Sequence, residues 1–210
     1  MPTRIVLADD HVLVRQGVKS LLEREGMQVV AEASDGQEAV QHAQALNPDI
    51  VVMDIGMPTL NGVDATRELG RCCPKAKPIL LTQHDEPQYV SEALDAGVKG
   101  YILKSQVASD LILAIRQVLR GEVYLSPGIS GAVMAAYRSK SDRGTDPLTA
   151  RERQVLQLIA EGKSTKDVAS LLGVSVKTAE SHRSRLMQKL DIHETASLVR
   201  YAVKRGLVQV

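Results

Sequence analysis

Five polar residues of this 210-residue chain close or directly follow short apolar runs of the sequence. They are Asp9, Asp10, Asp54, Thr82 and Lys104. Short apolar runs rich in Val, Ile and Leu are typical of strands that are buried on both faces of a parallel sheet. Because ligands of such sheets bind just outside the carboxyl ends of the strands, we expect the five side chains to meet at one edge.

The chemistry of this set favours a phosphoryl group held beside a divalent cation. Three carboxylates that lie close together raise one another's pKa unless a cation intervenes. A hard cation such as Mg²⁺, or alternatively Mn²⁺, takes carboxylate and phosphoryl oxygens as ligands. Lys104 could neutralise the phosphoryl group, Thr82 could donate a hydrogen bond to it, and Asp54 could be the nucleophile. Taken singly, Asp9 or Asp10 could be a helix cap and Lys104 a solvated charge, but the coincidence of all five favours a site.

The order of the elements predicts how the sheet is built. Apolar runs alternate with helical patterns through residues 4–121, and Gly26, Gly97 and Gly121 occur where helices should stop. Five strand–helix units with short connections indicate a doubly wound, flavodoxin-like (βα)5 domain of the α/β class. The expected strands are 5–8, 28–31, 50–53, 79–82 and 101–103, and the expected helices are 12–24, 36–46, 62–72, 87–96 and 106–120.

Charge is divided unevenly along the chain and indicates two modules. Residues 1–121 contain 12 basic and 16 acidic side chains, whereas residues 147–210 contain 11 basic and 6 acidic ones. A basic module tethered to an acidic one is typical of a protein that meets a polyanion through one part only. No apolar run approaches the roughly 20 residues of a membrane span, and the start leaves no room for a signal peptide, so we expect a cytoplasmic protein without membrane contact. The adjacent Cys72 and Cys73 are expected to be reduced thiols at a helix end.

The expected domain boundaries are 1–121 and 147–210, with a linker between them. Residues 122–146 contain Ser126-Pro127-Gly128 and a polar, turn-forming stretch from residue 138 on, which predicts a linker with one short helix over 129–137. Residues 147–210 predict an all-α domain of four helices. Residues 149–152 and 164–167 have the spacing of capping boxes that open the first two, and we expect Val168, Leu171 and Leu172 to face the core.

Several motifs of the first module carry a family resemblance. They are Asp9-Asp10-His11, the run Met53-Asp54-Ile55-Gly56-Met57-Pro58 with Asn61-Gly62, then Leu81-Thr82 and Gly100-Tyr101-Ile102-Leu103-Lys104. With them, residues 4–121 resemble the receiver domain of bacterial two-component response regulators. The resemblance implies that Asp54 accepts phosphate from a histidine kinase. It further implies that Asp10, Asp54 and the Gly56 carbonyl bind Mg²⁺ while Asp9 acts through water, and that Thr82 moves toward the phosphoryl group as Tyr101 turns inward behind it.

One residue departs from the receiver pattern. Gln83 follows the switch residue Thr82, where the family usually has a smaller residue. A bulkier amide at this place could hinder access of water or the kinase to the phosphoryl group. We therefore expect Gln83 to slow the loss of phosphate.

The basic module has the pattern of a helix-turn-helix. Two expected helices join across Gly173-Val174-Ser175, and the second places Ala179, Leu186 and Leu190 on one face. A recognition helix of this kind buries one stripe and presents polar groups to base edges, while basic neighbours reach phosphates. An ordinary helical hairpin is the alternative, but the net positive charge and the short turn argue against it. His182 is expected near the helix seam, in a structural role.

The motifs of this module also carry a resemblance. They are Leu148-Thr149-Ala150-Arg151-Glu152, Gly162-Lys163-Ser164-Thr165-Lys166-Asp167 and Ser175-Val176-Lys177-Thr178-Ala179-Glu180-Ser181-His182, with Lys189-Leu190. They resemble the LuxR-type helix-turn-helix of the NarL/FixJ group. The resemblance implies that Glu180, Ser181 and Ser184 read bases and that neighbours grip the backbone; the expected DNA contacts are Lys177, Thr178, Glu180, Ser181, Arg183, Ser184, Arg185 and Lys189.

The sequence therefore predicts a transcription regulator that a histidine kinase phosphorylates at Asp54 and that dimerises and binds double-stranded promoter DNA. Its own chemistry would be limited to phosphotransfer onto Asp54 and autodephosphorylation, so it is not expected to be an enzyme in the ordinary sense. A phosphatase of the haloacid-dehalogenase type is one alternative, but that family needs two acids two residues apart at the end of the first strand, where Asp9 and Asp10 are adjacent. A degenerate receiver that acts without phosphorylation, as a DNA-binding or interaction protein, is the other.

Overall fold

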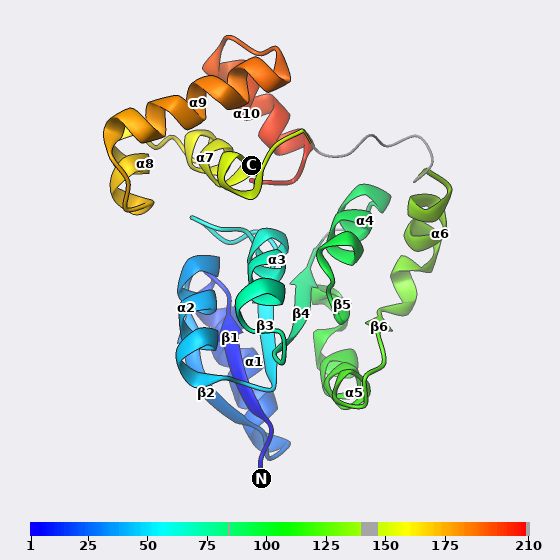
Figure 1. Cartoon of the computed structure of the whole chain (residues 1–210). Coiled ribbons are helices and arrows are strands. Elements are labelled where there is room, and N and C mark those ends of the chain that lie inside the picture. The colour runs from blue at the N-terminus through cyan, green and yellow to red at the C-terminus, as the bar shows by residue number, and fades with distance from the viewer. Residues whose placement is uncertain (84, 140–146, 209–210) are drawn as a thin grey trace. The chain divides into compact units, whose positions relative to one another are not determined.

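The computed structural model describes residues 1–83, 85–139 and 147–208, and the chain divides into two compact units at residues 142 and 143. The first unit alternates strands and helices, and the second consists of helices (Figure 1). The elements of the first unit are β1 (Arg4–Ala8), α1 (Val12–Arg24), β2 (Gln28–Ala33), α2 (Gly36–Leu46), β3 (Ile50–Asp54), α3 (Gly62–Cys72), β4 (Lys77–Thr82), α4 (Pro87–Ala96), β5 (Gly100–Leu103), the 3₁₀ turn η1 (Lys104–Gln106), α5 (Val107–Leu119), β6 (Tyr124–Leu125), η2 (Pro127–Ile129) and α6 (Ser130–Ser139).

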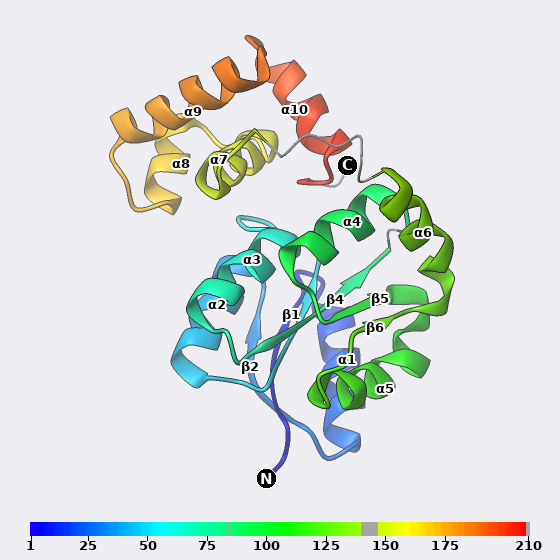
Figure 2. The same ribbon diagram turned by 45° about the vertical axis from the view of Figure 1, so that its right-hand side comes forward.

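The sheet of the first unit is parallel and has the strand order β2-β1-β3-β4-β5-β6. Helices α1 and α5 cover one face, and α2, α3 and α4 cover the other (Figure 2). The switch from β1 to β3 in the strand order is the point at which ligands of doubly wound sheets bind. The predicted flavodoxin-like α/β fold is therefore confirmed.

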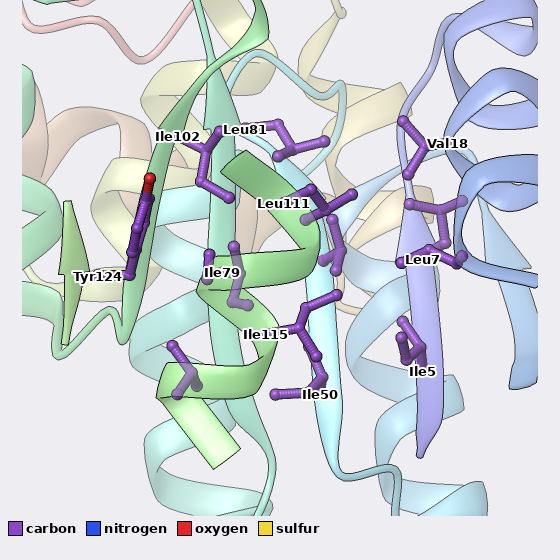
Figure 3. Packing of buried hydrophobic residues seen from close by; sticks show 14 residues of the cluster. Ile5, Leu7, Val18, Ile50, Ile79, Leu81, Ile102, Leu111, Ile115 and Tyr124 are labelled. Carbon is purple, nitrogen blue, oxygen red and sulfur yellow. The ribbon is translucent and has the colours of Figure 1, made fainter. Parts of the chain in front are cut away.

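The core between the sheet and helices α1 and α5 follows from the alternation of side chains along each strand. Ile5 and Leu7 of β1 point to this face, as do Ile79 and Leu81 of β4 (Figure 3). Leu111 and Ile115 of α5, one helical turn apart, meet them and are fully buried. Intervening strand residues such as Met53 are equally buried on the other face, which explains why the strands read as continuous apolar runs.

The prediction that a linker starts at residue 122 is wrong. Tyr124 pairs with Gly100 and Leu125 with Tyr101, so this segment adds a sixth strand at the edge of the sheet. Ser126 fixes the strand, because its Oγ accepts from the Leu103 backbone N–H at 3.3 Å. The predicted short helix is confirmed as α6, which lies beside α4 (Figures 1 and 2). The rest of the predicted linker, residues 140–146, lies outside the described residues.

The second unit packs its helices around one apolar cluster, as the helical pattern predicted. Leu156, Leu186, Leu198 and Ala202 are fully buried in it. The helices are α7 (Ala150–Ala160), α8 (Thr165–Leu171), α9 (Val176–Leu190) and α10 (Thr195–Lys204). Both predicted capping boxes are present, and α8 joins α9 through Gly173 in a left-handed conformation.

One core prediction for the second unit is wrong. Leu171 was expected to face inward with Val168 and Leu172, but its side chain is 40% exposed. It is the last residue of α8, where the helix turns toward Gly173, so its side chain leaves the buried stripe. Across the described part of the chain, no helix combines the length and the apolar character that a membrane crossing requires.

Candidate functional site

The carboxyl ends of four strands carry the predicted residues to one edge of the sheet in the first unit. Asp9 directly follows β1 and Asp54 is the last residue of β3, and these two strands are paired in parallel. Thr82 is the last residue of β4, and Lys104 comes directly after its neighbour β5. Asp9, Asp54, Thr82 and Lys104 therefore lie at the same edge of the sheet, as predicted from the strand ends.

Lys104 holds two carboxylates of this edge at once. Its Nζ lies 3.0 Å from Asp9 Oδ2 and 3.0 Å from Asp54 Oδ2, and both carboxylates are almost fully buried. Burial raises the pKa of Asp54 above its ordinary value, and repulsion from Asp9 and Asp10 raises it further. Lys104 lowers this pKa again, but only in part. Burial alone would lower the pKa of Lys104, but Asp54 and Asp9 together raise it above its ordinary value. The ammonium is therefore charged at neutral pH.

Asp10 and His11 extend the acidic cluster. Ligand atoms of Asp9, Asp10, His11 and Asp54 all lie within 4.8 Å of one another. The His11 backbone N–H donates to Asp9 Oδ1 at 2.8 Å, and His11 Nδ1 lies 2.8 Å from Asp10 Oδ1. Asp9 Oδ2 is buried and faces the Lys104 ammonium. Three carboxylates against one ammonium leave an excess of negative charge, and oxygen donors of this kind fit a hard divalent cation such as Mg²⁺.

The loop after β3 is packed closely against Asp54. A Cβ at Gly62 would collide with the backbone carbonyl oxygen of Asp54, so only glycine allows α3 to begin at this place. Asn61 caps the helix, because its Oδ1 accepts from the Asp64 backbone N–H at 2.9 Å. The half-buried Gly56 belongs to the same loop, and the role of its carbonyl as a metal ligand stays a prediction.

Thr82 and Tyr101 are joined behind the acidic cluster. Both side chains are fully buried, and a hydrogen bond links them. The receiver resemblance implies that Tyr101 turns inward as Thr82 moves; the side chain is already buried here, and its switch role stays a prediction. Burial raises the pKa of Tyr101 well above its ordinary value, so the phenol remains protonated. Gln83 follows Thr82 and is exposed.

In the second unit, α9 has the features expected of a recognition helix. Ser175 caps it, since its Oγ accepts from the Thr178 backbone N–H at 3.1 Å. Ala179 and Leu186 face the core, and His182 is half-buried near them. Most of the predicted DNA contacts lie on the solvent side: Lys177, Thr178, Glu180, Ser184, Arg185 and Lys189 are exposed, and Ser181 and Arg183 are half-buried.

Two predicted phosphate contacts have partners inside the second unit. Lys189 Nζ donates to Glu152 Oε2 at 2.7 Å, and the same oxygen accepts from the backbone N–H and the hydroxyl of Thr149 at 2.8 and 3.0 Å. Arg183 Nη2 donates to Thr195 Oγ1 at 2.8 Å. Burial alone would raise the pKa of Glu152, but the hydrogen bonds from Lys189 and Thr149 lower it below its ordinary value. Sequence reasoning missed the contact between Lys189 and Glu152 because these residues lie 37 positions apart.

Comparison with known proteins gives a match for each unit. Residues 5–116 match the response regulator receiver domain family, and residues 146–202 match the bacterial regulatory proteins of the luxR family. The transcriptional regulatory protein MctR of Rhizobium johnstonii is 39% identical over 206 residues, which cover 98% of this chain and 95% of that protein. The oxygen regulatory protein NreC of Staphylococcus haemolyticus is 40% identical over 214 residues, which cover 98% of this chain and 99% of that protein.

Solved structures agree with these matches. RcsB from Salmonella enterica serovar Typhimurium, bound to a promoter in the presence of the phosphomimetic BeF3⁻, has a TM-score of 0.62 at 27% identity, covering 97% of this chain and 100% of that one. A second structure, of the response regulator RcsB in complex with DNA, has a TM-score of 0.62 at 26% identity, covering 98% and 99%. The same relatives thus match both the receiver fold with its strand-end site and the basic helix-turn-helix, over almost the whole chain. The chain therefore belongs to the two-component response regulators of the NarL/FixJ group, transcription regulators that join a receiver domain to a LuxR-type DNA-binding domain.

Proposed function

We propose that phosphorylation of Asp54 by a sensor histidine kinase controls how this regulator dimerises and binds promoter DNA. The observation that carries the proposal is the Lys104 ammonium, which lies 3.0 Å from both Asp9 and Asp54 at the carboxyl edge of the sheet. A fixed cation beside the acceptor is already in position for the negative charge that a phosphoryl group brings.

In the proposed phosphotransfer, an Asp54 carboxylate oxygen attacks the phosphorus atom of the kinase's phosphohistidine, a P–O bond forms and the P–N bond breaks. Lys104 then pairs with one phosphoryl oxygen, and the Thr82 hydroxyl donates a hydrogen bond to another. Attack of water on the same phosphorus reverses the modification. Apart from this phosphotransfer and autodephosphorylation, we propose no turnover of an external substrate.

The acidic cluster would hold the divalent cation that this chemistry requires. Asp10, Asp54 and the Gly56 carbonyl would bind Mg²⁺, or alternatively Mn²⁺, and Asp9 would act through water. The bound cation would neutralise charge on the phosphoryl oxygens. The excess of carboxylates in this cluster over the Lys104 ammonium supports this assignment.

The phosphorylated state would then bias a two-state equilibrium of the receiver domain. Thr82 would leave its hydrogen bond with Tyr101 for the phosphoryl group, and Tyr101 would keep its buried position. We propose that this state favours a homodimer, whose two DNA-binding domains match half-sites about one helical turn apart. The RcsB structures, one of two RcsB dimers on DNA and one bound to a promoter with a phosphomimetic, support this by analogy.

We propose that α9 contacts DNA through its exposed, N-terminal part. Glu180, Ser181 and Ser184 would face base edges, and Glu180 would accept from a cytosine amine. Basic and hydroxyl side chains would contact phosphates; these are Lys177, Thr178, Arg183 and Arg185, and we reassign Lys189 to holding the helix.

A small phosphodonor such as acetyl phosphate tests the proposal without the kinase. Wild-type chain and Asp54→Asn are treated with the donor and Mg²⁺, and the phosphoryl mass increment, the sedimentation coefficient and the enrichment of fragments of its own genome are measured. We expect the wild type to gain the increment, sediment as a dimer and enrich specific fragments, and the variant to do none of these. A variant that responds like the wild type would refute the role of Asp54. A wild type that takes no phosphate but enriches the same genomic fragments with and without the donor would establish the degenerate receiver instead.

A further inference from the structure

The two cysteines of the chain lie side by side at the end of α3, outside the acidic site. Cys72 is the last residue of the helix and is exposed, whereas Cys73 is buried. The Cys72 thiol donates to Cys73 Sγ, and the two sulfur atoms are 3.5 Å apart. They are the only cysteines of the sequence, so any chemistry that needs two thiols of this chain falls on this pair.

The local sequence explains why two adjacent side chains converge. Consecutive residues of a helix do not face each other. Cys73 precedes Pro74, and the residue before a proline is driven out of the α region; accordingly, Cys73 has φ −137° and ψ 60°. Its backbone N–H still donates to the Leu69 carbonyl at 2.8 Å, and its own carbonyl accepts from the Ala76 N–H at 3.0 Å. The bend that brings the sulfurs together is therefore held on both sides.

This backbone disfavours an internal disulfide. All described peptide bonds are trans, and Cα atoms of neighbouring residues across a trans bond are about 3.8 Å apart. Disulfides normally need Cα atoms about 4.4–6.8 Å apart. The pair is thus built to remain two thiols, with both sulfur atoms close enough to share one ligand.

We propose that Cys72 and Cys73 form a chelating dithiol site for a pyramidal, thiophilic centre of the trivalent-arsenic type. Zinc–thiolate bonds are about 2.3 Å long; a linear centre with bonds of this length would hold the two sulfurs about 4.6 Å apart, which the observed 3.5 Å does not provide. A centre with bond angles near a right angle or somewhat wider fits this separation. No third Cys, His, Asp or Glu of the described residues joins the pair to form a cluster, so the remaining ligand comes from the bound species itself.

The reaction balances without an oxidant. An organic arsenoxide, R–As=O, and two thiols give the cyclic dithioarsenite and water: two S–H bonds and the As=O bond break, two As–S bonds form, and the protons leave with the oxygen. Cys72 is exposed and reacts first. Burial and the hydrogen bond with Cys72 raise the pKa of Cys73 to about 11, so Cys73 reacts second, when the arsenic is already held beside it.

Intact-mass measurement of the full chain with phenylarsine oxide tests the site. We expect one adduct that displaces one water, survives an excess of a monothiol and is released by a dithiol. Cys72→Ser and Cys73→Ser, each with one thiol left, should keep no adduct in the monothiol. An adduct that persists in either single variant, or none in the wild type, would overturn the proposal.

Pro74→Ala is a control that leaves both thiols in place. Without the proline, Cys73 can continue the helix, and the sulfurs should separate. The dithiol concentration that releases half of the adduct should therefore fall several-fold. An unchanged release from Pro74→Ala would refute the claim that the bend builds the site. An internal disulfide in the wild-type chain under mild oxidation, seen as the loss of two hydrogens, would refute it too.

Discussion

Replacing Lys189 by methionine separates two roles that the sequence could not distinguish. A lysine that contacts DNA phosphate and a lysine that holds α9 in place would both weaken DNA binding when removed. In the structure, Lys189 Nζ donates to the buried Glu152 carboxylate at 2.7 Å. Methionine keeps the length and apolar stem of the side chain but leaves this carboxylate without its cation. We expect Lys189→Met to destabilise the DNA-binding domain and to leave the number of phosphate contacts unchanged.

The expected loss of stability follows from the surroundings of the ion pair. Removing one partner of a fully buried pair costs about 3–5 kcal/mol, but the Lys189 side chain is 39% exposed, and solvent screens such a pair. Glu152 Oε2 also keeps both hydrogen bonds from Thr149. A loss of about 1–2 kcal/mol, the scale of one charge-assisted hydrogen bond, is therefore expected. Hydrogen exchange of the full chain should show it as faster exchange in α7 and α9.

The salt dependence of DNA binding distinguishes the two roles. Each phosphate contact contributes about −0.9 to the slope of log K against log salt concentration, and non-specific duplex DNA is sufficient for the measurement. We expect Lys177→Met, at an exposed position of the same helix, to reduce the slope by about 0.9. Lys189→Met should weaken binding with the wild-type slope. A slope reduced to the same extent by both substitutions, with unchanged hydrogen exchange in Lys189→Met, would refute the structural role of Lys189.

Gln83→Ala removes an exposed amide next to the switch threonine and should speed the loss of label from phosphorylated Asp54; equal rates would contradict this. Gly62→Ala places a Cβ on the Asp54 carbonyl and should lower the free energy of unfolding by about 1–3 kcal/mol, with an unchanged denaturation midpoint as the contrary result. Ser126→Ala removes a buried hydroxyl with two partners and should cost about 1–2 kcal/mol, read as faster exchange in β6. Folding lowers the pKa of Glu152. The stabilisation that Glu152 gives is therefore complete above its unfolded pKa of about 4.3 and is lost as pH falls through the folded pKa. Acid should accordingly close the stability gap between the wild type and Lys189→Met.

The sequence predicted those parts of the structure that depend on local patterns. Helix ends at Gly26 and Gly97 follow from the left-handed conformation that glycine adopts easily. The meeting of Asp9, Asp54 and Lys104 follows from the parallel sheet alone, because strand ends of one kind share an edge. No long-range information was needed for either result.

Features that depend on single long-range contacts could not be predicted in this way. Strand β6 consists of only two residues, which is too short to show a period, and it is fixed by Ser126, which bonds to Leu103 and Asp110. Burial and a hydrogen bond with Asp110 raise the pKa of Tyr124 in this strand to about 12, so its phenol also remains protonated. Nothing in the polar composition around residue 126 indicates these partners, which is why the segment resembled a linker.

The sixth strand also changes how the strand-end site relates to the rest of the first unit. Strand β5 carries Tyr101 and leads into Lys104, and it is paired on both sides, with β4 and with β6. Ser126 bonds to this strand twice, since its backbone N–H donates to the Tyr101 carbonyl at 2.9 Å and its Oγ accepts from the Leu103 N–H. Any shift of β5 must therefore move β6 or break its bonds. Strand β6 leads through η2 into α6, so a movement of β5 at the strand-end site would be passed along these hydrogen bonds toward α6.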